Sequence, residues 1–401
     1  MKKFEDLGLN KSILNTIKNL GFQNPTQIQE LSIPFIVKGG DIIGESATGS
    51  GKTLAFGCSI VEHVVHKQGL QALVITPTRE LAEQVKEELR RMSKDKYLKV
   101  IAVYGGVAIG PQIHGLVTAD VVVATPGRLL DHLGRRTIDM SNIKILVMDE
   151  ADRMFDMGFI DDVEEIIKTC PKKRQTLFFS ATISSKIKNL ANKYMHDPKN
   201  VSARRYVDPS KLKQVYCDIP RGLKISLLVH LLEKEKSGLV MVFCNTRKNA
   251  DFVARSLKAN GINAIAIHGG LTQNKRSRTL EMFNDAKVGV LVCTDVAARG
   301  LHIENVSHVY NYDIPKNPND YVHRIGRTAR VGEEGKVLNI LCDIDYDNFA
   351  RIQSEYRNFT IKRTEIPYLK RAVAIKVETR RGPRGSRGRG PRRHVYQSMR
   401  R

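Results

Sequence analysis

One stretch of ten residues, 44–53, constrains the fold and chemistry of this chain more than any other. It reads Gly-Glu-Ser-Ala-Thr-Gly-Ser-Gly-Lys-Thr, follows the apolar pair Ile42-Ile43 and precedes an apolar run. Glycines between a strand and a helix let backbone N–H groups face phosphate oxygens. A lysine then adds charge at the β- and γ-phosphates, and a threonine hydroxyl can bind Mg²⁺. The stretch predicts a nucleoside triphosphate site made by Thr48, Gly49, Ser50, Gly51, Lys52 and Thr53.

A second, acidic stretch supplies what such a site still needs. Glycine-rich matches of this kind arise by chance in roughly a few per cent of chains. Here, however, the apolar run 145–148 leads directly into Asp149-Glu150-Ala151-Asp152. Carboxylates at the end of a strand are what Mg²⁺-dependent phosphoryl transfer requires. We therefore predict that this acidic stretch and Thr53 form a site for Mg²⁺ and a nucleoside triphosphate; the family resemblance described below implies that the nucleotide is ATP and that Asp149 is the carboxylate that binds Mg²⁺.

Charge and cysteine usage narrow the class of protein. The 401 residues carry a formal net charge of +23, which predicts a polyanionic partner. The six cysteines lie far apart without a CxxC spacing, so they predict neither a zinc site nor a disulfide framework. No run of apolar residues reaches the length of a membrane helix, and acidic residues interrupt the N-terminal run. We expect a cytoplasmic protein in a reducing compartment.

Alternating apolar patterns predict two α/β domains, each a mostly parallel sheet with helices on both faces. We place the first domain at 1–205, a linker at 206–213, the second domain at 214–365 and a basic, disordered tail at 366–401. In the first domain we expect a helix over 4–20, a loop over 22–29, a helix from Thr78 and strands over 72–75, 100–104, 120–124, 143–148 and 176–179. In the second we expect helices over 248–259 and 274–284 and strands over 215–219, 239–243, 264–267, 289–293, 308–312 and 337–341.

Polar clusters follow nearly every predicted strand. Ligands of open parallel sheets bind at the carboxyl ends of the strands. Any one cluster is more often an ordinary turn or helix cap, by perhaps two to one, because such junctions use Thr, Ser, Asp and Pro anyway. Five clusters on one edge of the first sheet favour a binding surface.

The second half has no phosphate loop of its own. Its arginines at 324, 327 and 330 are spaced three apart, which predicts one helical face. A solvated basic stripe is the alternative. Because no nucleotide loop accompanies these arginines, they are free to act as fingers at the nucleotide site of the first half.

Taken in order, these motifs make the chain resemble the DEAD-box RNA helicases of superfamily 2 over residues 4 to about 345. The resemblance implies two tandem RecA-like domains and ATP hydrolysis coupled to local unwinding of short RNA duplexes. It implies that Phe4, Phe22, Gln29 and His302 contact ATP, and that Lys52, Asp149, Glu150, Arg327 and Arg330 are catalytic, with Glu150 activating water. It also implies that Asp152, Ser180, Thr182, His323 and Arg324 couple the two sites.

The same resemblance implies a surface for sequence-independent binding of the RNA backbone. Its residues come from both halves of the chain: Pro77, Thr78, Arg79, Gly105, Gly106, Thr125, Pro126, Arg128, Arg247, Gly269, Gln273, Arg276 and Thr294. We expect a monomer, with room for regulatory protein partners.

Five positions depart from the common pattern of the family. Ser46 and Ala47 stand where Ala and Gln are usual, Gln27 replaces a Pro and Ala329 replaces a Gly. His302 stands where an Asp usually binds the ribose hydroxyls. An imidazole lacks the two acceptor oxygens of a carboxylate, so we expect weaker ribose discrimination, which His302→Asp would restore.

Two other functions are consistent with parts of the sequence. The first is an RNA chaperone or clamp that acts through the basic tail, where residues 371–401 carry eleven Lys/Arg against one Glu. The second is a DNA translocase of the same superfamily, which Phe22 and Gln29 disfavour. The tail itself is either a solubilising extension or an RNA tether.

Overall fold

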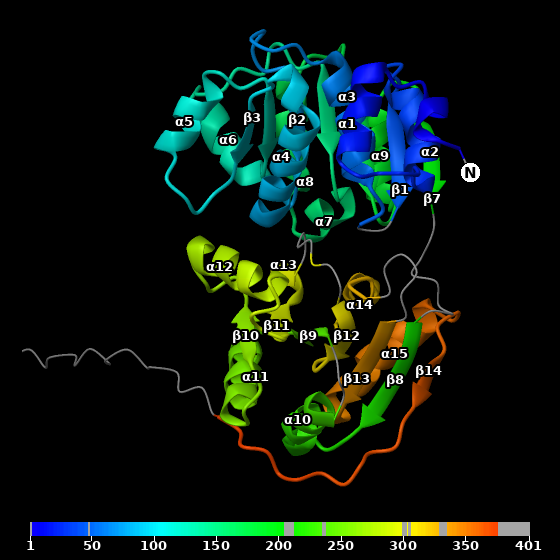
Figure 1. Ribbon diagram of the computed structural model, residues 1–401, viewed down its shortest axis with the longest axis vertical. Helices are drawn as coiled ribbons and strands as arrows, with labels where there is room; N and C mark the ends of the chain where they lie inside the picture. The colour runs from blue at the N-terminus through cyan, green and yellow to red at the C-terminus, as the bar shows by residue number, and fades with distance from the viewer. Residues whose placement is uncertain are drawn as a thin grey trace, which may run out of the picture.

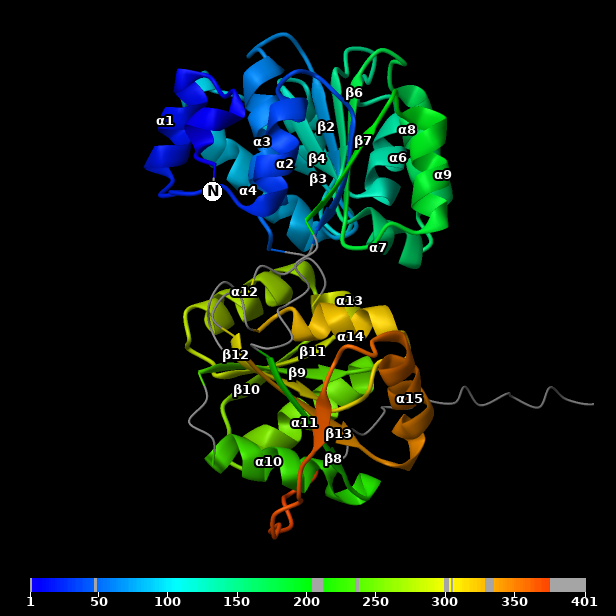
Figure 2. The same ribbon diagram turned by 90° about the vertical axis from the view of Figure 1, so that its right-hand side faces the viewer.

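The computed structural model describes residues 2–46, 49–203, 212–234, 238–298, 303, 306–328 and 335–375. These residues form two lobes, each built on a seven-stranded sheet, and Figure 1 and Figure 2 show the lobes stacked end to end. Helix α7 of the first lobe faces α12, α13 and α14 of the second in both views. No helix in the described part of the chain is long and apolar enough to cross a membrane.

The first domain alternates strands and helices around a parallel sheet of order β3-β4-β2-β5-β6-β1-β7. Its strands are β1 (Ile42–Ser46), β2 (Ala72–Ile75), β3 (Val100–Val103), β4 (Val121–Ala124), β5 (Ile145–Met148), β6 (Gln175–Ser180) and β7 (Lys199–Ala203). Its helices are η1 (Phe4–Leu7), α1 (Lys11–Asn19), α2 (Gln27–Ile36), α3 (Lys52–His63), α4 (Arg79–Met92), η2 (Lys94–Lys96), α5 (Gly110–Leu116), α6 (Pro126–Gly134), α7 (Ala151–Asp156), α8 (Ile160–Thr169) and α9 (Ser185–Tyr194).

The second domain repeats this plan with a parallel sheet of order β10-β11-β9-β12-β13-β8-β14. Its strands are β8 (Leu212–Asp218), β9 (Leu239–Cys244), β10 (Ala264–Ile267), β11 (Val290–Thr294), β12 (Val306–Asn311), β13 (Gly335–Leu341) and β14 (Ile361–Arg363). Its helices are η4 (Arg221–Leu223), α10 (Lys224–Lys234), α11 (Arg247–Ala259), α12 (Gln273–Asn284), α13 (Asp295–Ala298), α14 (Pro318–Ile325), η5 (Asp343–Asp345) and α15 (Tyr346–Glu355).

Each sheet is buried on both faces, which confirms the predicted fold class. In the first domain, buried side chains of α1 to α4 pack on one face and those of α6 to α9 on the other. In the second, α10 and α11 cover one face and α12 to α15 the other. Successive residues of a strand point to opposite faces, so Ile42 joins one core cluster of the first domain and Ile43 the other. Apolar runs at every strand position are the consequence.

The predicted N-terminal helix over 4–20 is wrong, because the chain turns between Leu7 and Lys11. Gly8 has a φ of 79°, a left-handed conformation that ends η1. The side chain of Asn10 then accepts a hydrogen bond from the backbone N–H of Ile13 at 2.8 Å and caps the start of α1. Two short helices therefore replace the single one.

The predicted loop over 22–29 ends earlier than expected, because α2 begins at Gln27. Thr26 and Gln29 form a capping box in which the Gln29 side chain accepts the Thr26 backbone N–H at 2.9 Å. The spacing Thr-x-x-Gln is a sequence signature of a helix start, so this boundary was readable from the sequence.

Both predicted ends of the second domain also differ from the structure. Strand β8 begins at Leu212, two residues inside the range predicted as linker, and most of that range lies outside the described residues. Residues 366–375, predicted as the start of a disordered tail, lie against the second domain instead. The backbone N–H groups of Ala372 and Ile375 donate to Ser226 Oγ and Ser256 Oγ at 3.1 and 3.0 Å. Figure 1 shows this segment passing around the end of the domain opposite the first lobe.

Candidate nucleotide site and interdomain interface

The phosphate loop joins β1 to α3, as the sequence predicted. Gly49 and Gly51 adopt φ values of 77° and 89°, and Gly51 is the N-cap of α3. A Cβ at Gly51 would stand 2.3 Å from Gln29 Nε2, so the position has no room for a side chain. Lys52, the first residue of α3, is buried, and its Nζ donates to the carbonyl oxygen of Ser46 at 3.2 Å. Thr48 lies outside the described residues.

Helix α2 is tied to this loop through two side chains. Gln29 Nε2 donates to the carbonyl oxygen of Gly51 at 2.9 Å, and Thr26 Oγ1 donates to that of Ser50 at 2.8 Å. Phe22, just before α2, is half exposed, whereas Phe4 is buried. Of the residues expected to contact the base, Gln29 thus touches the loop directly, and the roles of all of them at adenine stay predictions.

The acidic residues lie at the carboxyl end of β5. Burial raises the pKa of Asp149 to about 6, an effect that nearby Lys52 opposes and nearby Glu150 adds to. Glu150 is the N-cap of α7 and has a φ of 53°, a left-handed conformation that is uncommon for a residue with a Cβ. A buried carboxylate beside a lysine and at the edge of a phosphate loop is chemistry that fits Mg²⁺ bound to a triphosphate. The described residues contain no cluster of three His, Cys, Asp or Glu that would suggest another metal site.

Asp152, Ser180 and Thr182 form one hydrogen-bond network between α7 and the end of β6. The Asp152 backbone N–H donates to Ser180 Oγ at 3.0 Å, and Ser180 Oγ donates to the Thr182 carbonyl oxygen at 2.8 Å. Asp152 Oδ2 accepts from the Thr182 backbone N–H and hydroxyl at 2.9 and 3.1 Å. The structure thus brings together the first three predicted coupling residues.

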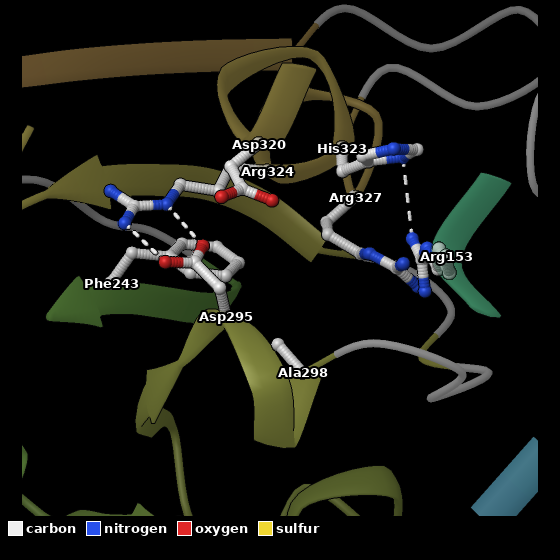
Figure 3. Close-up of a pocket in the computed structure, with 8 residues that line it drawn as sticks. All are labelled: Arg153, Phe243, Asp295, Ala298, Asp320, His323, Arg324 and Arg327. Carbon is white, nitrogen blue, oxygen red and sulfur yellow. Dashed lines mark hydrogen bonds and ion pairs between the residues drawn. The ribbon is translucent and has the colours of Figure 1, made fainter. Parts of the chain in front are cut away.

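A polar pocket lies where α7 meets the second domain. Figure 3 shows Arg153 from the first domain facing His323 and Arg327 from the second. Arg153 Nη1 donates to Glu150 Oε2 at 2.9 Å, and Arg153 Nη2 donates to His323 Nδ1 at 3.3 Å. Arg330 and His302 lie outside the described residues.

Of the predicted finger arginines, the two in the described part of the chain, Arg324 and Arg327, do not share a helical face. Helix α14 ends at Ile325, so Arg324 is helical while Arg327 follows in a turn. Arg324 is also fully buried inside the second domain, where its Nε and Nη2 bind the two carboxylate oxygens of Asp295 at 2.6 and 2.7 Å. Its remaining donors reach Asn245, Asn311 and the carbonyl oxygen of Asp313. The spacing of three failed as a signal because the helix stops before the second arginine.

In the first domain, the predicted RNA-binding residues lie on neighbouring loops after β2, β3 and β4. Thr78 caps α4, and Thr125 and Pro126 begin α6. The Arg79 guanidinium lies over Gly106, where a Cβ would be 2.0 Å from Arg79 Nη1. Arg128 Nη2 donates to the Val107 carbonyl oxygen at 3.1 Å, while its Nη1 is buried with no hydrogen-bond partner. Pro77 and Gly105 flank these residues in the same loops.

In the second domain, the corresponding residues follow β9, β10 and β11. Arg247 begins α11 and lies over Gly269, and Thr294 ends β11. Gln273 and Arg276, at the start of α12, both contact Glu80 of the first domain. Gln273 Nε2 donates to Glu80 Oε1 at 3.1 Å, and Arg276 Nη2 lies 2.9 Å from the same oxygen. Their roles toward RNA stay predictions.

Sequence reasoning missed Glu80 and Arg153, the first-domain residues that make the contacts described above across the interface. Both directly adjoin predicted motifs, Glu80 after Arg79 and Arg153 after Asp152. Their proximity to predicted residues was the only signal. The partner of each lies on the other domain and could not be inferred from spacing along the chain.

The comparisons with known proteins agree with this geometry. The chain matches the DEAD/DEAH box helicase family over residues 26–190 and the helicase conserved C-terminal domain over residues 223–332. It is 44% identical over 341 residues to the DEAD-box ATP-dependent RNA helicase CshA of Bacillus subtilis, an alignment that covers 84% of this chain and 69% of that protein. The chain belongs to the DEAD-box family of ATP-dependent RNA helicases.

Another relative and two solved structures extend the comparison. This DEAD-box protein is 45% identical to the ATP-dependent RNA helicase CshA of Listeria monocytogenes, covering 85% of this chain and 66% of that one. S. cerevisiae Dbp5 bound to RNA and ADP BeF3 matches with a TM-score of 0.83 and 30% identity over 91% of this chain and 96% of that chain. A DEAD box protein from Methanococcus jannaschii is 40% identical, with a TM-score of 0.55 over 90% and 99% of the two chains. The chain spans about two thirds of the length of the CshA relatives.

Proposed function

We propose that this DEAD-box protein hydrolyses ATP at a site completed by both domains and uses the cycle to unwind short RNA duplexes. The observation that carries the proposal is the contact of α7, which follows Asp149 and Glu150, with His323 and the turn that holds Arg327. A nucleotide between these elements would touch both domains, so its binding energy would favour their docking. RNA laid across both domains would do the same, which makes the two binding events mutually reinforcing.

The residues at the loop divide the work of hydrolysis. Lys52 and the backbone N–H groups after Gly49 bind the phosphates, and Thr53 with Asp149 would hold Mg²⁺. The metal supplies charge neutralisation at the transferred phosphoryl group. Glu150 orients and deprotonates the attacking water, and Arg327 with Arg330 stabilises the charge that develops in the transition state.

The RNA surface runs over the loops of both domains. Buried donors without partners, such as Arg128 Nη1 and Arg276 Nε, are suited to phosphate oxygens. Contacts with phosphates carry no base information, so we expect binding to be independent of sequence. The overall TM-score is 0.83 to Dbp5 bound to RNA and ADP BeF3 but 0.62 to Dbp5 bound to Nup159, Gle1, IP6 and ADP. This difference supports an arrangement of the two domains that is close to the one in which RNA and nucleotide are bound.

Unwinding would follow from the shape of that surface. Docked domains that accept a bent single strand but not an A-form duplex would separate a few base pairs, at a cost of roughly 1 to 2 kcal/mol per step. Short duplexes are therefore the expected substrate. The alternative of a chaperone that acts through the basic tail finds no support in the comparisons, since each relative described above is named as a helicase.

Glu150→Gln tests the proposal. The amide cannot take a proton from water, so we expect RNA-stimulated ATP hydrolysis to fall by a factor of about 10² to 10⁴ and duplex unwinding to be lost. Binding of a fluorescent ATP analogue should persist. Glu87→Gln is the matched control, because Glu87 forms an exposed ion pair with Arg90 on α4, away from the phosphate loop. Unwinding by Glu150→Gln at the rate of the unchanged protein, with annealing intact, would favour the chaperone instead.

A further inference from the structure

Arg153 occupies an unusual position for a charged side chain. It is 1% exposed and belongs to α7, directly after the acidic motif. Its two terminal nitrogens bind different domains. Nη1 donates to Glu150 Oε2 at 2.9 Å within the first domain, and Nη2 donates to His323 Nδ1 at 3.3 Å in the second. Figure 3 shows this side chain between α7 and α14.

The two contacts of the guanidinium use different donors of one rigid group. A guanidinium has only donors, so Arg153 donates in both contacts, to Glu150 Oε2 and to His323 Nδ1. The Arg153–Glu150 pair is shielded from water, with side chains 1% and 7% exposed. A planar guanidinium can serve both acceptors at once, because its terminal nitrogens point in fixed directions.

We propose that Arg153 is a positioning residue that makes the orientation of Glu150 depend on docking of the second domain. The inference rests on the proposed role of Glu150 as the base. While His323 is in contact, the guanidinium is held at both ends, and the carboxylate that it binds is held with it. When the domains separate, Arg153 keeps only the Glu150 contact and gains rotational freedom. The base then loses its fixed position next to the attacking water.

This role differs from simple neutralisation of a buried carboxylate. Neutralisation requires one positive charge near Glu150, which a lysine could also provide from the same position of the helix. Bridging requires two N–H donors held in fixed directions, one for Glu150 and one for His323. The single ammonium group of a lysine cannot reach both acceptors in this way. The two explanations therefore predict different results for Arg153→Lys.

The experiment measures kcat and KM for ATP in the full chain, with and without saturating single-stranded RNA. For Arg153→Lys we expect hydrolysis without RNA and KM for ATP to stay within about twofold, whereas kcat with RNA falls about 10-fold. For Arg153→Gln we expect a larger fall in kcat with RNA, because the buried carboxylate also loses its cation. Arg90→Gln is the matched control, since Arg90 forms an ion pair with Glu87 at the same spacing of three residues on an exposed helix face.

A double-mutant cycle isolates the contact between the domains. His323→Ala and Arg153→Lys should each lower the RNA stimulation, and the double variant should be no worse than the poorer single variant. Thermal unfolding and binding of an ATP analogue report whether each variant is folded. If Arg153→Gln fails to fold, the cycle built on Arg153→Lys decides the question alone.

Three results would overturn the inference. If Arg153→Lys keeps the full RNA stimulation of kcat, Arg153 serves only as a counter-ion for Glu150. If the losses of RNA stimulation in Arg153→Lys and His323→Ala add up in the double variant, the two residues do not form a working bridge. A rise in RNA-independent hydrolysis would make Arg153 a restraint on the base instead. Glu150→Gln separates these results from a failure of the proposed function. If that variant hydrolyses ATP at the full rate, Glu150 is not the base and both proposals fall, whereas its inactivity leaves the function standing whatever Arg153 does.

Discussion

The two domains have the same strand order but different chemistry at the end of their first strand. Each sheet follows the order third, fourth, second, fifth, sixth, first and seventh strand of its domain. After β1 the first domain has a glycine-rich loop and then Lys52 at the start of α3. After β8 the second domain has Pro220, η4 and then Lys224 at the start of α10. The scaffold is shared, and the glycine-rich loop is the feature by which we propose that the first domain binds the phosphates.

The difference between the two domains extends to the contacts of Lys52 and Lys224. Both are buried, at 6% and 3% exposed, and both begin the helix that follows the first strand. Lys224 forms an ion pair with the buried Asp345 at 2.8 Å, whereas the Nζ of Lys52 donates to a carbonyl oxygen. The second domain uses its lysine in a buried ion pair, whereas we propose that the lysine of the first domain binds phosphate.

Replacing Lys52 should therefore impair ATP hydrolysis, and replacing Lys224 should impair folding stability. These are the largest effects that we expect. Lys52→Met should lower ATP hydrolysis at least about 10³-fold, because the charge on the transferred phosphate goes unmatched, and leave the thermal midpoint within a few degrees. Lys224→Met should lower the free energy of unfolding by about 3 kcal/mol or more, because Asp345 stays buried without a cation. Chemical denaturation and ATPase assays on both variants check the pair. Equal loss of stability in both variants would contradict the comparison.

The arginine–glycine contacts are the feature that the two domains share. Arg79 lies over Gly106 in the first and Arg247 over Gly269 in the second. A Cβ would stand 2.0 Å from the guanidinium at Gly106, where φ is 82°, but 3.2 Å from it at Gly269. Gly106→Ala should accordingly weaken RNA binding about 10-fold, the cost of roughly 1.4 kcal/mol of strain and displacement. Gly269→Ala should weaken it by about threefold or less.

Fluorescence anisotropy with a labelled single strand measures both alanine variants, and affinity for an ATP analogue is the control that should not change. A larger loss for Gly269→Ala than for Gly106→Ala would mean that the second arginine is the more tightly held of the two.

Mg²⁺ binding at the acidic site of the first domain should depend on pH near 6, whereas RNA binding should not. The pKa of Asp149 is raised to about 6 by burial, so the carboxylate begins to take up a proton as the pH falls toward 6. Only the ionised form binds Mg²⁺, and the metal competes with the proton. Affinity for Mg²⁺ should thus be fully present above pH 7 and fall about 10-fold by pH 5. Titration of Mg²⁺ at saturating ATP analogue follows this loss, and Asp149→Asn should bind weakly at every pH.

The smallest effect concerns the tail. Residues 366–375 pack on the second domain, so a variant that tests the tail should end at Ile375. Residues 376–401 carry ten Lys/Arg and one Glu. If they tether RNA, their removal should flatten the dependence of log affinity on log salt by about 0.7 per lost phosphate contact and leave unwinding by the core intact. An unchanged slope would identify the tail as a solubilising extension.

The two-domain fold and the phosphate loop could be predicted from the sequence because their signals lie in residues that are close together along the chain. Apolar runs such as 121–124 predict buried strands by composition alone, and the glycines of the loop are adjacent along the chain. The bridge from Arg153 to His323 spans 170 residues and depends on how two domains dock, which no local pattern encodes. The expected arginine face failed for a different reason, since α14 ends at Ile325 with Gly326 as its C-cap, a local stop signal that the spacing of three ignores. The edge strand β7 was missed because only its alternate residues are buried.

The division of labour between the domains is tested most directly by Arg327→Ala in the full chain. Arg327 belongs to the second domain and is buried at the interface, in the same pocket as Arg153 of the first domain. We predict that the variant binds an ATP analogue within about threefold of the unchanged protein, while hydrolysis with saturating RNA falls at least about 10³-fold. Hydrolysis that stays RNA-stimulated in this variant would contradict a catalytic site completed by the second domain.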